Sequence, residues 1–100
     1  MAQIPKHLQG ILWSADIEKL DLIRDKQYII HQILCYGRWE HLRWLFSIYP
    51  KSEIVSVFLD NPYKDYSFPR LNFVKNHLLN LKDHHVNEYH YVKNIPRDLR

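Results

Sequence analysis

The sequence predicts an all-α fold, a small single-domain bundle of about four to five helices, and three observations support this prediction. The chain has 100 residues, of which 46% are hydrophobic and 25% charged, a mixture typical of one compact domain with a modest core. Apolar residues recur at helical spacing in successive segments. Proline or glycine separates most of these segments, as expected for short helices joined by tight turns.

The first half of the chain predicts a short helical turn and then a longer helix. Ser14 and Asp16 can each cap a turn over residues 17–20. A helix is expected from about residue 24 to 36, because isoleucines, a leucine and a tyrosine share one stripe of the helical wheel. Gly37 is expected to end this helix in the left-handed conformation.

The next helix is expected over residues 38–49, because Pro50 prevents its continuation. Leu42 and Leu45 lie on its inward face, whereas Trp44 projects to the opposite side. Two explanations are open. Either this helix is central and covered on two sides, or Trp44 is an exposed anchor for a partner.

Two further helices follow in the second half. Ser52 is expected to cap a short helix over residues 53–59. Pro69 is typical of the first turn of a last long helix that runs to about residue 81. The residues expected to face inward on that helix are Leu71, Val74, Leu78 and Leu81.

The domain organisation is expected to be a helical domain over residues 1–82 and a polar C-terminal arm over residues 83–100. The arm contains histidine and tyrosine but has lost the helical apolar pattern. Tyr89-His90-Tyr91 is compatible with a short strand, and the whole arm is compatible with an extended segment that orders on a partner.

Composition favours a cytoplasmic protein. The single cysteine, Cys35, cannot form an internal disulfide, which favours a reducing compartment. No apolar run approaches the roughly 20 residues that a membrane-spanning helix needs, and residues 1–6 contain no apolar signal region. No membrane association is expected.

The sequence does not predict an enzyme. Its two glycines, Gly10 and Gly37, cannot form a glycine-rich phosphate loop. Cys35 lies on a predicted helix, away from a helix N-terminus that would activate the thiol. Acidic residues at 16, 18 and 21 lie near helix starts, where they favour the helix dipole. No cofactor or small-molecule substrate is indicated.

The histidines raise the question of a metal site. His84, His85 and His90, together with Glu88, form the one cluster among the seven histidines. Structural zinc sites in short chains usually use paired thiolates, which this sequence lacks. We therefore expect no metal, and the alternative is that these histidines make partner binding sensitive to pH.

The last long helix provides an alternative function in DNA binding. The two preceding helices, joined by Tyr49-Pro50-Lys51, have the spacing of a helix-turn-helix. Asparagine can read adenine, and lysine and arginine can hold phosphates, but a solvated helix face has the same composition. The candidate DNA-binding residues are Arg70, Asn72, Lys75, Asn76 and Asn80.

Several motifs resemble those of a family of small bacterial helical proteins of unknown function. They are the run from Ile29 to Gly37, the run Leu42-Arg43-Trp44-Leu45-Phe46, and Leu71-Asn72-Phe73; Phe73-Val74 departs from the expected aromatic pair. This family is similar to antitoxin-like partners of nucleotidyltransferase-type toxins. The resemblance covers about residues 11–81 and implies a neutralising or regulatory role without catalysis.

The expected function is therefore a non-catalytic protein-binding module, the antitoxin-like or regulatory half of a bacterial toxin–antitoxin pair. Its partner would be a toxin-like protein or a second copy of the chain. A DNA-binding regulator of helix-turn-helix type is the alternative. Aromatic side chains are enriched at interfaces. The candidate partner contacts are Trp44, Tyr63, Tyr66, Tyr89 and Tyr91.

Overall fold

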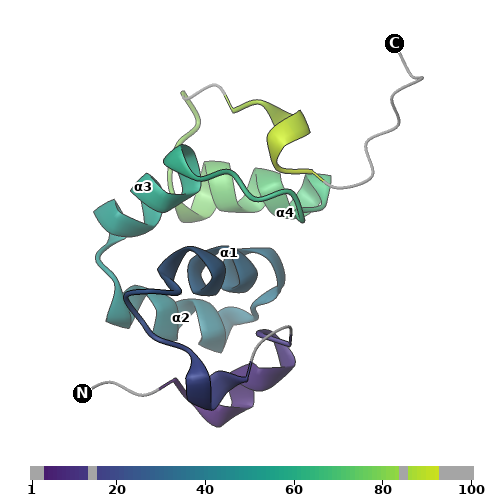
Figure 1. Cartoon of the computed structure of the whole chain (residues 1–100). Helices are drawn as coiled ribbons and strands as arrows, with labels where there is room; N and C mark the ends of the chain where they lie inside the picture. Colours follow the sequence, from purple (N-terminus) through teal and green to yellow (C-terminus); the bar gives the residue numbers. More distant parts are fainter. Residues whose placement is uncertain (1–3, 14–15, 84–85, 93–100) are drawn as a thin grey trace.

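The computed structural model describes residues 4–13, 16–83 and 86–92, and within them the chain is all-helical (Figure 1). The prediction of an all-α fold is confirmed. Three short 3₁₀ turns, η1 (Lys6–Gly10), η2 (Ile17–Lys19) and η4 (Glu88–His90), accompany the larger helices. The four α-helices are α1 (Lys26–Tyr36), α2 (Trp39–Ile48), α3 (Lys51–Asp60) and α4 (Phe68–Asn72).

Helix α1 is the centre of the fold. It packs against both α2 and α3. Every residue from 29 to 35 is buried, although the expected apolar stripe covered less of the helix. A helix that is buried around most of its circumference is typical of a core element rather than a surface element. Burial on this scale also encloses two polar side chains, His31 and Gln32.

The turn after α1 differs from the expectation. Gly37 has φ −70° and ψ 149°, an extended conformation, so the prediction of a left-handed cap is wrong. The structure gives another reason for glycine at this position. A Cβ atom would lie 2.6 Å from the Ile33 carbonyl oxygen and 3.1 Å from the His41 Cβ. Glycine lets the start of α2 pack directly against the last turn of α1.

The connection between α2 and α3 is shorter than expected. Only Tyr49 and Pro50 lie between the two helices, and α3 begins at Lys51. The Pro50 carbonyl oxygen accepts hydrogen bonds from the backbone amides of Glu53 and Ile54. Ser52 therefore lies inside the first turn and is not the N-cap, because Pro50 ends one helix and occupies the N-cap position of the next.

The last predicted helix is distorted along its length. Helix α4 ends at Asn72, and a π-helix, η3 (Phe73–Leu78), continues it. The Leu79 amide donates to the Val74 carbonyl over 2.8 Å, a bond that spans five residues instead of four. The extra residue shifts the apolar register, so Leu79 is buried where Leu78 was expected, and Leu78 is half-buried.

The described part of the C-terminal arm packs back onto the helices (Figure 1). The Tyr66 amide donates to the Tyr91 carbonyl over 2.9 Å, and a single parallel bridge pairs Tyr66 with Val92. The Tyr91 hydroxyl donates to the Phe58 carbonyl over 2.6 Å. Residues 89–91 do not form the strand considered above, because the chain turns there in η4.

None of the helices in the described ranges is both long and apolar enough to cross a bilayer.

Candidate functional site

Arg70, expected to contact DNA phosphates, caps helix α1. Its Nε donates to the Leu34 carbonyl over 2.6 Å, and its Nη2 donates to the Gly37 carbonyl over 2.6 Å. These carbonyls have no partner within the helix, so a guanidinium at the C-terminus also favours the helix dipole. Partial burial lowers the pKa of Arg70. The guanidinium ties the start of α4 to the end of α1.

The asparagines of the predicted DNA-binding face do not form one row. Asn72 ends α4, Asn76 lies in η3, and Asn80 lies beyond the helix. The backbone of Asn80 has φ 58°, which is the left-handed conformation, two residues after the end of η3. The fourfold spacing in sequence requires regular α-helix, and the π-helix between Asn72 and Asn80 removes that regularity.

Helices α2 and α3 form the predicted helix pair, and α3 carries more acidic than basic side chains. α3 carries one lysine, Lys51, and two carboxylates, Glu53 and Asp60. Glu53 also lies 3.5 Å from the Lys26 ammonium. A recognition helix lies close to phosphates, which favour a basic surface. The charge of α3 therefore does not support insertion of this helix into a groove of DNA.

The five candidate partner contacts occupy different environments. Tyr89 is exposed, whereas Trp44 and Tyr63 are half-buried against the core. Tyr66 and Tyr91 are buried, at 0% and 3% exposure, and hydrogen-bond within the fold. The structure thus gives Tyr66 and Tyr91 a role in joining the C-terminal segment to the core.

A polar network surrounds His31 inside this core. His31 Nε2 lies 2.6 Å from the Asn61 carbonyl oxygen, and Nδ1 lies 2.8 Å from the Tyr66 hydroxyl. Because a carbonyl can only accept, Nε2 carries the proton and Nδ1 accepts from Tyr66. Burial lowers the pKa of His31 to about 4, so the ring is neutral at pH 7. The Tyr63 ring stacks on the imidazole, with centroids 5.2 Å apart.

Three large aromatic side chains outside the set of predicted partner contacts are exposed at one end of the molecule. Trp13 is 55% exposed, Trp39 66% and Phe68 44%. We call these three residues the aromatic end. The end of α1 and the starts of α2 and α4 lie together there, on the right of Figure 1. The Trp13 ring packs on Tyr36 with centroids 4.8 Å apart, which places it at the same junction.

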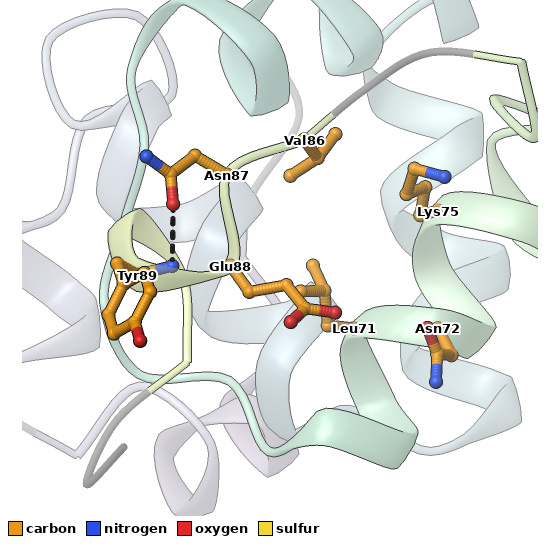
Figure 2. Close-up of a pocket in the computed structure, with 7 residues that line it drawn as sticks. All are labelled: Leu71, Asn72, Lys75, Val86, Asn87, Glu88 and Tyr89. Carbon is orange, nitrogen blue, oxygen red and sulfur yellow. Dashed lines mark hydrogen bonds between the residues drawn. The ribbon is translucent and has the colours of Figure 1, made fainter. Parts of the chain in front are cut away.

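A hollow of about 480 Å³ lies on another part of the surface, between α4 with η3 and the C-terminal segment (Figure 2). It brings together residues from separate sequence predictions: Asn72 and Lys75 from the DNA-binding set, Tyr89 from the partner set, and Glu88 from the histidine cluster. Its other lining residues are Leu71, Val86 and Asn87.

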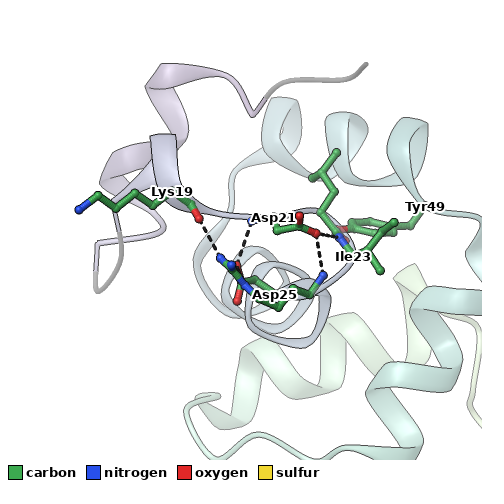
Figure 3. Close-up of polar contacts among 7 residues, drawn as sticks. Lys19, Asp21, Ile23, Asp25 and Tyr49 are labelled. Carbon is green, nitrogen blue, oxygen red and sulfur yellow. Dashed lines mark hydrogen bonds and ion pairs between the residues drawn. The ribbon is translucent and has the colours of Figure 1, made fainter.

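The carboxylates near the start of α1 are engaged by the backbone (Figure 3). Asp21 accepts hydrogen bonds from the amides of Ile23 and Arg24, and these bonds lower the pKa of Asp21. Asp25 accepts from the Asp21 amide over 2.9 Å and from the Arg24 guanidinium. Asp16 caps η2 by accepting from the Glu18 amide. These acids therefore stabilise turns.

Part of the predicted histidine cluster lies outside the described residues, namely His84 and His85. His90 is exposed on η4. Within residues 4–13, 16–83 and 86–92, no group of three or more His, Cys, Asp or Glu side chains is arranged to hold a metal ion.

The fold and these surfaces define a small helical domain whose described surface exposes two tryptophans at one end. The chain belongs to a family of unknown function (DUF6922), which matches residues 8–58. The family description contains no link to antitoxins. The matched segment includes Trp13 and Trp39 but excludes Phe68 and the hollow. No curated protein and no solved structure matches the chain.

Proposed function

We propose that the protein is a non-catalytic module that binds a protein partner through its aromatic end. The observation that supports this proposal is the exposure of Trp13 and Trp39 beside the α1–α2 junction. Tryptophan is enriched among the residues that dominate binding energy at interfaces. Full burial of a large apolar side chain contributes roughly 1.5–3 kcal/mol. A partner that covers the exposed parts of Trp13 and Trp39 would gain part of this free energy on binding.

Two hydrogen-bonded contacts hold together the helix ends next to the aromatic end. Arg70 fixes the start of α4 against the end of α1. The Tyr36 hydroxyl hydrogen-bonds to the Asp65 carboxylate over 2.5 Å, which fixes the loop before α4 to the same end. A preorganised surface loses little conformational entropy on association, and this increases affinity for a given contact area.

The DNA-binding alternative has less support. Arg70 is engaged by carbonyl oxygens, the asparagines do not form one row, and α3 carries more acidic than basic groups. The antitoxin-like role rests on the sequence resemblance described above, and it makes a toxin of the nucleotidyltransferase type the partner to be sought.

The test is affinity capture by the tagged full chain from an extract of its source cells, with and without nuclease. We expect a stoichiometric protein that survives nuclease treatment and is lost with a Trp13→Ala, Trp39→Ala double variant. The matched control is Ile23→Ala, because Ile23 is 86% exposed on a turn outside the aromatic end. Capture of nucleic acid alone would contradict the proposal and favour the DNA-binding alternative.

A further inference from the structure

The hollow between α4 with η3 and the C-terminal segment has the size of a small-molecule site. Its volume is about 480 Å³, and ligand sites in proteins span roughly 300–1,000 Å³. Figure 2 shows the Glu88 side chain extending from the C-terminal segment toward α4. The hollow is chemically distinct from the aromatic end, because it combines charged, amide and apolar groups.

Two opposite charges line the hollow from different walls. Lys75 comes from η3, and Glu88 comes from η4. Among the described residues, neither side chain makes an ion pair. The Lys75 ammonium group donates a 3.3 Å hydrogen bond to the side-chain oxygen Oδ1 of Asn76. A ligand carboxylate can pair with Lys75 once this side chain turns from Asn76 into the hollow, and a ligand ammonium group can pair with Glu88.

The remaining lining is suited to an apolar group. Leu71, near the C-terminal end of α4, is buried, and Val86 on the C-terminal segment is half-buried. The exposed ring of Tyr89 adds an aromatic surface. This mixture of a few polar groups with apolar surface is typical of sites that orient a small ligand.

The π-helix is a second feature of this place. Lys75 lies within η3, and its carbonyl oxygen accepts from the Leu81 amide over 2.6 Å in a widened turn. π-Helical turns are rare and occur frequently at functional sites. Lys75, which lies in this π-helix, is the one basic residue among those that line the hollow.

We propose that the hollow binds a small zwitterion of the amino-acid type. Its carboxylate pairs with Lys75, its ammonium group pairs with Glu88, and an apolar side chain packs on Leu71 and Val86. This site is independent of the partner-binding surface, since none of its lining residues belongs to the aromatic end.

The experiment is a titration of the isotopically labelled full chain with free leucine and free phenylalanine, followed by the NMR signals of backbone amides. Each amino acid is compared with its N-acetyl derivative and its carboxamide, which lack one charge each. The variants are Lys75→Gln and Glu88→Gln, with exposed Lys64→Gln and Glu40→Gln as matched controls.

We expect at least one free amino acid to shift the signals of residues 71–75 and 86–89. Each blocked derivative, and each of the two site variants, should weaken binding by at least about tenfold, because each removes one charge-assisted hydrogen bond. The control variants should bind as the wild type does. Absence of shifts at millimolar ligand, or binding that survives loss of either charge, would overturn the proposal.

Discussion

The Arg70 guanidinium donates a 2.6 Å hydrogen bond to the carbonyl oxygen of Gly37, across 33 positions of the chain. This contact joins the two parts of the fold that flank the aromatic end. It also gives Arg70 a role in stabilising the end of α1, and the phosphate contact expected from the sequence stays a prediction.

Replacing Arg70 should destabilise the fold. Arg70→Ala leaves the Leu34 and Gly37 carbonyls without this donor, so we expect the free energy of unfolding to fall by about 2–3 kcal/mol. Arg70→Lys should recover less than half of the loss, because an ammonium group lacks the planar fork. Urea denaturation measures both changes. An equal effect from Arg43→Ala, an exposed arginine on α2, would show that the contacts of Arg70 are unimportant.

The two glycines should respond in opposite ways to alanine. In Gly37→Ala the new methyl group meets the Ile33 carbonyl oxygen at 2.6 Å, so we expect a loss of about 1–3 kcal/mol in unfolding free energy. Gly10 has no atom within 4 Å of such a methyl group. Gly10→Ala should therefore be neutral or stabilise the fold by up to about 1 kcal/mol. Equal thermal midpoints for the two variants would refute this explanation of Gly37.

Asn80 should tolerate glycine but not alanine. Its φ of 58° lies in the left-handed region, where a Cβ atom is unfavourable and asparagine is accepted better than most residues. Asn80→Ala should cost about 1 kcal/mol of unfolding free energy, and Asn80→Gly should cost nothing measurable. Asn76→Ala, within η3, is the matched control. A similar cost for all three substitutions would contradict this role of the backbone.

Acid should weaken the fold through His31. The pKa of His31 is about 4 in the folded protein and about 6.5 when unfolded, so between these values the unfolded state binds more protons. Stability is fully present above pH 6.5 and falls as the pH drops toward 4, by about 3 kcal/mol for this group. His31→Asn should remove this part of the slope in denaturation curves measured from pH 7 to 4, whereas His90→Asn, an exposed control, should not. An unchanged slope in His31→Asn would rule out His31 as the source.

The helices were predictable because their signals are local. Apolar spacing, Pro50 and Pro69 placed the helices to within a few residues, and Asp16 caps its turn as expected. The π-helix was not predictable, because no residue in 73–78 marks a five-residue hydrogen bond. Its register shift explains why Leu79, and not Leu78, enters the core.

The candidate site depended on contacts that are distant in sequence. Helical spacing shows which residues share a face, but it does not show which face another segment covers. Tyr66 and Tyr91 are buried where the C-terminal segment meets the core, while Trp39 is exposed at the start of α2. Arg70 could not be assigned to α1 because its acceptors lie more than 30 residues away. The one available signal for Trp39 was its position on the flank of the inward face of α2.

The measurement that tests the central claim most directly compares affinity and stability in Trp39→Ala. Trp39 is 66% exposed, so its loss should change the free energy of unfolding by less than about 0.5 kcal/mol. Affinity for the captured protein partner should fall by about tenfold or more, with Ile23→Ala unchanged in both respects. A large loss of stability, or an affinity equal to that of the wild type, would contradict the assignment of the aromatic end as the partner-binding surface.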